Sequence, residues 1–276
     1  MAAVAPQTTA VGNSWIGSAK LLRTHARLLF RVTLNDIRQR YAGSMLGFSW
    51  AFVAPLLVLI IYAVIYLEIF RIRVPTLTSP EYVLYVFCGL VPYLALAEAI
   101  GTGVSAVVSN RSVLNNTVFP IDLAPIKPVL SMQVVMVTGM TIVIVGAGLT
   151  RDIHATILLL PVIWLLNMLW LAGTNWILSL LNVVFRDLQN LVQSVLMVML
   201  VASPIAYTPD MVPSALKPLL ALNPFAYFVV AYQQVIMLGI WPSVPHMILL
   251  VVMSLGTFWL GSWFFWKAKR VIVDYV

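Results

Sequence analysis

Six stretches of the chain are apolar over the length needed to cross a lipid bilayer, and they leave little of the sequence for anything else. A helix that spans the hydrocarbon core needs about 20 apolar residues. The six stretches cover residues 46–70, 82–107, 123–149, 156–184, 188–207 and 244–265. Charged residues make up only 9% of the chain, against about a quarter in soluble domains. We therefore expect an all-α integral membrane protein with six transmembrane helices.

The positions of the basic residues give the expected orientation, because Lys and Arg accumulate on the cytoplasmic side of a membrane. With six spans and both termini inside, the outer side holds only Arg71, Arg73, Arg151 and Lys217. The cytoplasmic side holds 12 of the 16 basic residues, namely Lys20, Arg23, Arg27, Arg31, Arg38, Arg40, Arg111, Lys127, Arg186, Lys267, Lys269 and Arg270. This asymmetry favours six spans with both ends in the cytoplasm.

One further apolar stretch lies between the fifth and sixth spans. It reads NPFAYFVVAYQQVIMLGI, from Asn223 to Ile240, and it is short and carries Gln233 and Gln234 near its centre. Counting it as a seventh span would place the basic C-terminus outside. We expect residues 209–240 to form a re-entrant or interfacial segment on the outer side, introduced by the Pro-rich turn TPDMVPSALKP. An ordinary packed loop helix is the alternative.

A basic amphipathic helix precedes the first span. After residues 1–19, which we expect to be flexible, residues 20–41 place their cations within an arc of roughly 80° on a helical wheel. These cations are Lys20, Arg23, Arg27, Arg31 and Arg38. Such a helix lies in the membrane interface. It is either an anchor that orients the chain or a docking surface, and docking is favoured because orientation needs fewer cations.

Several polar and aromatic side chains fall within the spans. Glu98 is either a carboxylate that faces a pore, in a helix made irregular by Pro92 and nearby glycines, or a satisfied carboxyl near a boundary. Asn167 and Asn175 are expected to bridge helices. The aromatic residues exceed what interfacial belts require, and their rings suit stacking on sugars. We expect a channel lined by Trp50, Tyr62, Tyr66, Tyr93, Glu98 and Tyr207.

No motif for catalysis or nucleotide binding is present. The sequence has no G-x-x-x-x-G-K-[ST] loop, H-E-x-x-H motif, Cys/His ligand cluster or G-x-S-x-G elbow. We therefore expect no catalytic residue, no metal site and no cofactor in this chain. Uphill movement of a substrate would need energy from another subunit or from an ion gradient.

Four stretches resemble, in order, the permeases of type-2 ABC transporters that export polysaccharides. The first, RQRYAGSMLGFSWAFVAPLLVLIIY, carries the pattern R-Y-x-x-S-x-L-G-x-x-W at the entry to the first span. The others are SNRSVLNNTVFPIDLAPIKPVL, LNVVFRDLQNLVQ, and SPIAYTPDMVP together with NPFAYFVVAYQQVI. The most similar members of that family export O-antigen, capsular polysaccharide or teichoic acid.

The resemblance implies a permease domain over residues 42–276 in a bacterial inner membrane. It implies a homodimer with two copies of a separate ATPase, which binds ATP and Mg, and a lipid-linked polysaccharide as substrate; no nucleic acid is implied. It places ATPase contacts in the interfacial helix and in the segment after the second span. The residues concerned are Arg23, Arg27, Arg31, Arg38, Asn110, Arg111, Asn115 and Phe119.

The resemblance also gives roles to two further segments. Arg186 and Asp187 form a cytoplasmic motif at the end of the fourth span, and we expect them to have different partners because adjacent helical residues do not face each other. The outer gate would include Pro204, Asn223, Pro224 and Gln233. Many members carry a basic residue where this chain has Gln233 and Gln234, so an electrostatic role of the gate is not implied here.

Two other functions are compatible with parts of the sequence. The same architecture would serve a permease that exports a lipid or a drug, which would show a closed lateral cleft in place of a wide aromatic channel. A membrane-embedded glycosyl- or acyltransferase would need acid and base groups that converge near a membrane face. The carboxylates Asp122, Asp152, Asp187 and Glu98 are scattered, which disfavours the transferase.

Overall fold

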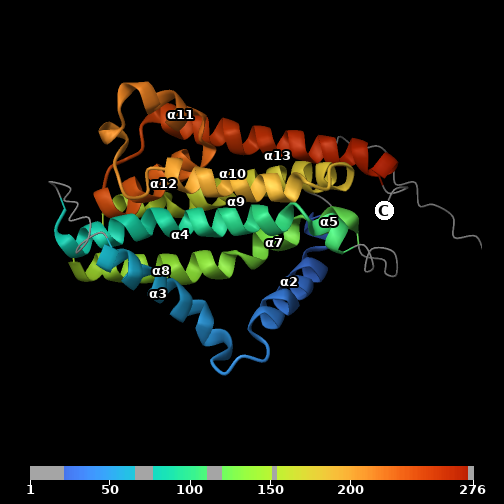
Figure 1. Cartoon of the computed structure of the whole chain (residues 1–276), viewed down its shortest axis with the longest axis horizontal. Helices are drawn as coiled ribbons and strands as arrows, with labels where there is room; N and C mark the ends of the chain where they lie inside the picture. Colours follow the sequence, from blue (N-terminus) through green and yellow to red (C-terminus); the bar gives the residue numbers. More distant parts are fainter. Residues whose placement is uncertain (1–21, 66–76, 111–119, 151–153, 273–276) are drawn as a thin grey trace, which may run out of the picture.

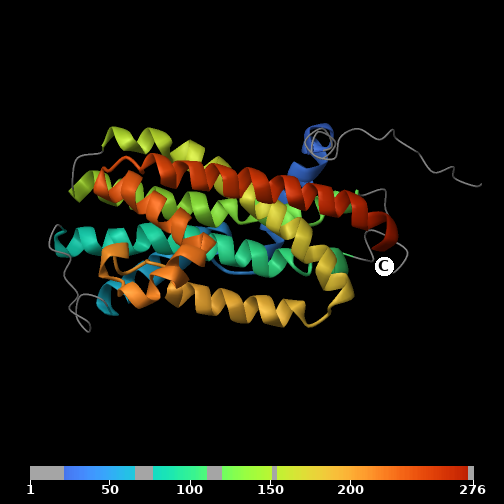
Figure 2. The same cartoon turned by 90° about the horizontal axis from the view of Figure 1, so that it is seen from above.

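The structure is a helical bundle. It is a computed structural model that describes residues 22–65, 77–110, 120–150 and 154–272, and within these ranges every regular element is a helix. Five helical stretches are long and apolar enough to cross a membrane: Gly47–Val64, Ser79–Gly103, Ile121–Thr150, Ala155–Val184 and Val244–Ala268. They run mostly side by side (Figures 1 and 2). The prediction of an all-α integral membrane protein is confirmed, while residues 1–19 and the end of the first span lie outside the described residues.

Helix α4 (Ser79–Gly103) forms the centre of the bundle (Figures 1 and 2). A capping box begins it: the backbone N–H and the hydroxyl of Thr78 both donate to Glu81, at 2.8 Å each. In its apolar stretch 78% of the residues are buried. The helix runs through Pro92 without a break, so the irregularity that one of the two readings of Glu98 assumed does not interrupt it. Tight packing on α8 (Gln133–Thr150), α9 (Leu160–Val184) and α12 (Pro224–Gln233) supports it across the proline.

The third and fourth spans each contain a short lead-in helix. The third consists of η3 (Ile121–Leu123), α7 (Ile126–Ser131) and α8, and the fourth of η4 (Ala155–Leu159) and α9. Asn175 of α9 is fully buried and donates to the carbonyls of Ala99 at 3.0 Å and Pro125 at 3.2 Å. It therefore bridges three helical segments, as the sequence predicts.

Helices α9 and α13 (Val244–Ile272) form the most extensive helix pair. Two glycines face each other at their crossing, because a Cβ atom on Gly261 would lie 2.2 Å from the carbonyl oxygen of Gly173. A Cβ atom on Gly173 would lie 2.3 Å from the carbonyl oxygen of Thr257. The backbones thus approach more closely than any other residue would permit, as in small-residue packing of membrane helices.

Helix α10 (Leu188–Ala202) is shorter than the predicted fifth span. Its 15 residues reach about 22 Å, which is less than the roughly 30 Å hydrocarbon core. The helix stops at Ala202 because Pro204 disfavours a helical conformation of the preceding residue, and Ser203 is extended, with φ −86° and ψ 141°. Residues 203–207, which we expected to complete this span, therefore continue outside the helix.

The segment between α10 and α13 folds back at one end of the bundle. It contains η5 (Pro209–Met211), η6 (Ser214–Leu216), α11 (Lys217–Leu222), α12 and a π-helical turn, η7 (Gln234–Leu238). Residues 214–222 and 224–238 meet at 96°, where Pro224 holds Asn223 in an extended conformation. Both arms lie at the same end (Figure 1), which we call the α12 end; this arrangement fits the predicted re-entrant segment.

The opposite end, called the α5 end after α5 (Ala106–Ser109), carries α2 (Ala26–Tyr41). Leu29 of α2 packs into a small apolar cluster with Ile126, Trp176 and Phe265. From there α2 runs obliquely away from the bundle and meets α3 (Trp50–Val64) in a V shape, through η1 (Gly47–Ser49) (Figure 1). Helix α2 ends at Tyr41, the residue at which the predicted interfacial helix also ends.

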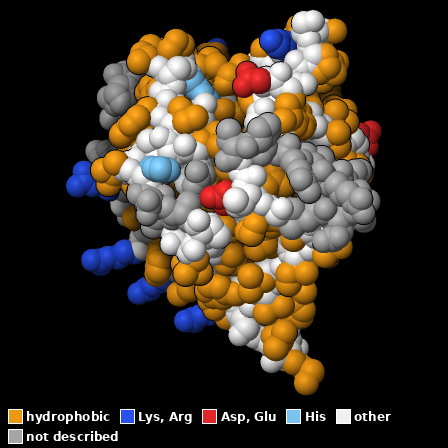
Figure 3. Space-filling view, turned by 90° about the vertical axis from the view of Figure 1, so that its left-hand side faces the viewer, with side chains coloured by type: hydrophobic (Ala, Val, Ile, Leu, Met, Phe, Trp, Pro, Cys, Tyr) orange, Lys and Arg blue, Asp and Glu red, His pale blue; other side chains and the backbone are white. Residues whose placement is uncertain are grey.

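The first span is the least buried of the five spanning stretches. Only 6% of the residues in the stretch Gly47–Val64 are buried. The connection to α2 exposes Met45, Leu46 and Phe48, and it forms the largely hydrophobic projection at the bottom of Figure 3. Figure 3 looks onto the α12 end, where the Lys and Arg side chains lie only at the margins. The described chain thus has an uncovered apolar arm on one side.

Candidate functional site

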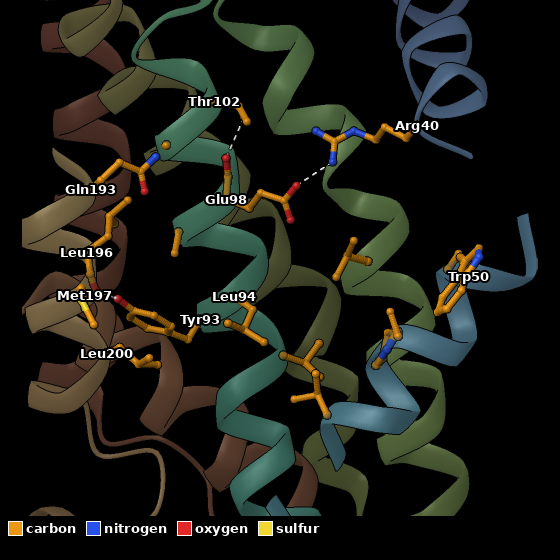
Figure 4. A pocket seen from close by; sticks show the side chains of 18 of the residues that line it. Arg40, Trp50, Tyr93, Leu94, Glu98, Thr102, Gln193, Leu196, Met197 and Leu200 are labelled. Carbon is orange, nitrogen blue, oxygen red and sulfur yellow. Dashed lines mark hydrogen bonds and ion pairs between the residues drawn. The ribbon is translucent and has the colours of Figure 1, made fainter. Parts of the chain in front are cut away.

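A lateral groove of about 850 Å³ lies between α3, α4 and α10, near the junction of α2 and α3 (Figure 4). The short α10 and the outlying α3 form its two sides, and α4 forms its base. Its lining residues are Arg40, Tyr41, Trp50, Ala51, Ala54, Pro55, Val58, Phe87, Val91, Tyr93, Leu94, Ala97, Glu98, Gly101, Thr102, Val135, Gln193, Ser194, Leu196, Met197 and Leu200.

Polar groups gather in the half of the groove nearer the α5 end. This half contains Arg40, Glu98, Thr102, Gln193 and Ser194. The other half is lined by apolar side chains such as Leu94, Met197 and Leu200 (Figure 4). The difference follows from the sequence of α10, LQNLVQSVLMVMLVA, whose polar residues all lie in its first two turns. A ligand with a polar part and an apolar part therefore fits the groove in one orientation.

Arg40 connects α2 to the base of the groove. Its Nη1 atom donates to Oε1 of Glu98 at 2.6 Å, and its Nε atom lies 3.7 Å from Oδ2 of Asp36 (Figure 4 shows the first pair). The Arg40 side chain is 33% exposed and that of Glu98 is 46% exposed. One guanidinium group therefore forms ion pairs with a carboxylate on its own helix and with a carboxylate on α4.

Asp36 extends this network to α7. Its Oδ1 atom lies 2.9 Å from Nζ of Lys127, and its Oδ2 atom accepts a hydrogen bond from the hydroxyl of Ser131 at 2.8 Å. Burial alone would raise the pKa of Asp36. The hydrogen bonds from Lys127 and Ser131 and the positive charges of Lys127 and Arg40 outweigh this effect and lower the pKa. The carboxylate is therefore ionised at neutral pH. Two cations and two carboxylates form a neutral network that joins α2, α4 and α7.

Three of the six predicted channel residues line the groove. Trp50, Tyr93 and Glu98 all line the groove, although the Tyr93 hydroxyl donates to the carbonyl of Leu196 and so ties α4 to α10. Tyr62 is half-buried against the main core and does not line it. Tyr207 lines a different groove, and Tyr66 lies outside the described residues. Both readings of Glu98 apply: its carboxylate faces the groove, and it is satisfied by an ion pair with Arg40.

Of the predicted ATPase contacts that the structure describes, those of α2 and the residues just before it are exposed, and Asn110 is half-buried. Arg23, Arg27, Arg31 and Arg38 are exposed on or just before α2. Asn110 ends α5, where its amide donates to the carbonyl of Ala106 at 2.7 Å. Arg186 and Asp187 are both exposed at the α9–α10 junction, at the α5 end. Arg111, Asn115 and Phe119 lie outside the described residues.

The predicted gate residues are brought together at the α12 end, where Pro204, Asn223 and Gln233 are buried and Pro224 is half-buried. Asn223 caps α12 by accepting from the backbone N–H of Phe225 at 3.0 Å, and its amide donates to the hydroxyl of Ser203 at 2.9 Å. The Gln233 amide donates to the carbonyl of Ile205 at 2.9 Å. Pro204 lies in the buried segment between these contacts, and Pro224 begins α12. In this conformation Gln233 holds the end of α10 against the re-entrant segment.

The sequence analysis did not single out Asp36, and it assigned Arg40 and Lys127 to the cytoplasmic side without giving them a role in a site. The spacing of Asp36 and Arg40, four residues apart, would have indicated an ion pair on one helix face. Nothing local indicated Glu98 as a partner, since 58 residues separate it from Arg40.

Comparison with known proteins supports the predicted resemblance. A model of the ABC-2 type transporter family matches residues 27–237, which include the groove, all of α2 but its first residue, and most of the re-entrant segment. The O-antigen export system permease protein RfbA of Myxococcus xanthus is 28% identical over 257 residues, which cover 90% of this chain and 94% of that protein. A protein with the same description from Klebsiella pneumoniae is 27% identical over 215 residues, covering 77% and 81%.

A more distant relative is the polysialic acid transport protein KpsM of Escherichia coli. It is 23% identical over 231 residues, which cover 83% of this chain and 88% of that protein. The family match extends over more than half of the chain and includes every element that forms the groove. The chain therefore belongs to the ABC-2 type transporter family.

Proposed function

We propose that this protein is the membrane permease of an exporter that moves a lipid-linked, O-antigen-like polysaccharide across the bacterial inner membrane. The support from relatives is that two proteins described as O-antigen export system permease proteins, and one described as a polysialic acid transport protein, match most of its length. The observation that carries the proposal is the groove, whose polar half suits a glycan and whose apolar half suits a lipid. Trp50, at its edge, offers an aromatic face on which a sugar ring can stack.

A separate ATPase subunit supplies the energy in this proposal and binds ATP and Mg. The exposed cations of α2 form the docking surface, together with Asn110 and the segment after it. In the described part of the chain, the basic side chains of α2, Arg186 and Lys267 belong to the α5-end half of the bundle. By the positive-inside rule this end faces the cytoplasm. Both termini then lie inside the cell.

Two copies of the permease would complete the channel. Helix α3 is an apolar span with 6% of its residues buried, so one chain leaves it uncovered. The groove is open between α3 and α10. A second copy placed against this side would close the groove into an enclosed path and would bury the exposed face of α3. We therefore propose a homodimer that binds two ATPase subunits.

Filling the groove is expected to block export. In Ser194→Trp a bulky ring occupies the polar half, where Ser194 is exposed on α10. We expect glycan export to fall at least about ten-fold, the scale on which a small misplacement in a site affects turnover. The measurement is uptake of a labelled lipid-linked glycan into the lumen of proteoliposomes that contain the permease and its ATPase.

The matched control is Leu165→Trp, which adds the same ring at an exposed position of α9 that lies outside the groove. This variant should export at the wild-type rate, and both variants should bind the ATPase equally. Equal export by Ser194→Trp and Leu165→Trp would show that substrate does not pass through the groove.

Export of a lipid without a glycan is the second candidate. A separate groove of about 720 Å³ is lined almost wholly by apolar side chains of α10, residues 207–213 and α11, including Met197, Val201, Tyr207 and Leu220. Such a surface suits acyl or prenyl chains. Proteoliposomes that translocate a fluorescent phospholipid but no lipid-linked glycan would favour this candidate.

A further inference from the structure

Helix α2 has few apolar contacts with the bundle. Its buried residues are Leu29 and Thr33, both in the first half of the helix. The second half is held by polar contacts, from Asp36 to Lys127 and Ser131 of α7 and from Arg40 to Glu98 of α4. The position of the C-terminal half of α2 relative to the groove therefore depends on the ion-pair network.

The covalent connection from α2 to α3 is poorly suited to transmit a displacement. It contains Gly43 and Gly47, whose φ angles of +78° and +51° are in the left-handed region. A Cβ atom at either glycine would have no neighbour within 4 Å, and the residues between them are exposed. Local contacts give the connection a turn structure of its own: the Ser44 hydroxyl donates to the carbonyl of Tyr41 and accepts from the N–H of Gly47, and the rings of Tyr41 and Phe48 meet edge-on at 5.7 Å. The side chains of Met45, Leu46 and Phe48 are nevertheless exposed, so they do not hold the connection against the bundle. A contact that passes directly from α2 to α4 would therefore transmit a displacement more firmly than this connection.

We propose that Arg40 is a positioning residue that makes the docking helix α2 and the groove wall α4 move together, by pairing with Asp36 and Glu98 at the same time. A displacement of α2 then reaches the polar half of the groove directly through Glu98. The role requires arginine, because its planar guanidinium spreads one positive charge over several N–H groups: Nη1 bonds Glu98 at 2.6 Å while Nε stays 3.7 Å from Asp36 in an ion pair. The lysine ammonium is a single point of charge. The proposal rests on the transport function proposed above.

The first test measures how firmly α2 is held, in the permease alone. Hydrogen exchange of peptides that cover residues 35–41 is compared between wild type, Arg40→Gln and Glu98→Gln in lipid nanodiscs. We expect exchange in both variants to be about two- to five-fold faster, as for loss of a partly exposed ion pair, with peptides of α9 and α13 unchanged. Unchanged exchange at residues 35–41 in both variants would overturn the proposal, whatever the protein transports.

The second test measures coupling in the complex with the ATPase, as glycan molecules exported per ATP hydrolysed. We expect Arg40→Gln to lower this ratio about five-fold or more while the ATPase stays bound, since coupling between sites is typically of that size. Glu98→Gln should lower it as well. The double variant should be no worse than Arg40→Gln alone, because both changes remove the same link.

Two variants separate bridging from other effects. Arg40→Lys keeps the positive charge of α2 but loses the fork, and we expect its ratio to fall as in Arg40→Gln. Gln39→Ala removes an exposed neighbouring side chain and should leave the ratio unchanged. Two results would contradict the proposal that Arg40 links α2 to α4. One is a wild-type ratio of glycan exported to ATP hydrolysed in Arg40→Lys. The other is a ratio in the Arg40→Gln/Glu98→Gln double variant that falls by the product of the two single losses. Absence of glycan export by the wild-type complex would instead contradict the proposed function, and the exchange experiment would still decide the positioning role.

Discussion

Replacing Arg27, Arg31 and Arg38 together by glutamate is expected to abolish binding of the ATPase subunit. All three side chains are exposed on α2, and the triple change turns a basic surface into an acidic one. Complementary charges at an interface set recognition, and like charges placed opposite each other cost several kcal/mol. In affinity purification of the tagged permease, we expect the ATPase to fall from stoichiometric amounts to background.

Insertion of the triple variant into the membrane should stay intact. Lys127, Arg186, Lys267, Lys269 and Arg270 still mark the cytoplasmic side, so the positive-inside rule is still satisfied. The matched control changes the same three residues to lysine and keeps the charge; it should retain the ATPase, with binding that weakens as salt is raised. Unchanged recovery of the ATPase with the glutamate variant would assign these cations to membrane anchoring alone.

Replacing Gly173 by alanine is expected to destabilise the bundle severely. The added Cβ atom would lie 2.3 Å from the backbone oxygen of Thr257, and a backbone atom cannot move aside as a flexible side chain can. Helices α9 and α13 must separate, so the loss should reach about 3 kcal/mol or more, at the upper end of overpacking effects. Thermal unfolding of the purified permease should shift down by about 5 °C or more.

The control for this change lies on the other helix of the pair. Gly256 of α13 has no atom within 4 Å of an added Cβ atom. Alanine also favours a helix over glycine by about 1 kcal/mol. Gly256→Ala should therefore unfold at the wild-type temperature or slightly above it. Equal unfolding temperatures for the two alanine variants would show that α9 and α13 do not pack through Gly173.

Much of the fold follows from hydrophobic length and turn chemistry. The spans appear near the predicted residues because apolar runs of about 20 residues have few alternatives in a membrane. The early end of α10 was also readable, since Pro204 forces Ser203 out of the helix. The apolar stretch continues to residue 207, so hydrophobicity alone did not show that the helix ends at Ala202. The π-helical turn Gln234–Leu238 had no such local signal.

The candidate site was harder to predict, because its residues meet only through tertiary packing. Glu98 was identified as a costly charge at membrane depth, yet its partner Arg40 lies 58 residues away and looked like one more cation before the first span. Gln233 was expected at an outer gate from the resemblance, and the structure buries it against Ile205. Single residues of unusual polarity can be recognised in a sequence, whereas their partners depend on how the helices pack.

The most direct test of the account is reconstitution of the purified permease with and without its ATPase subunit. ATP hydrolysis and entry of a labelled lipid-linked glycan into the proteoliposome lumen are measured in the same samples. We predict that the permease alone shows neither activity, and that the two subunits together hydrolyse ATP and translocate the glycan. Robust ATP hydrolysis by the permease alone, or no glycan entry with both subunits present, would contradict the account.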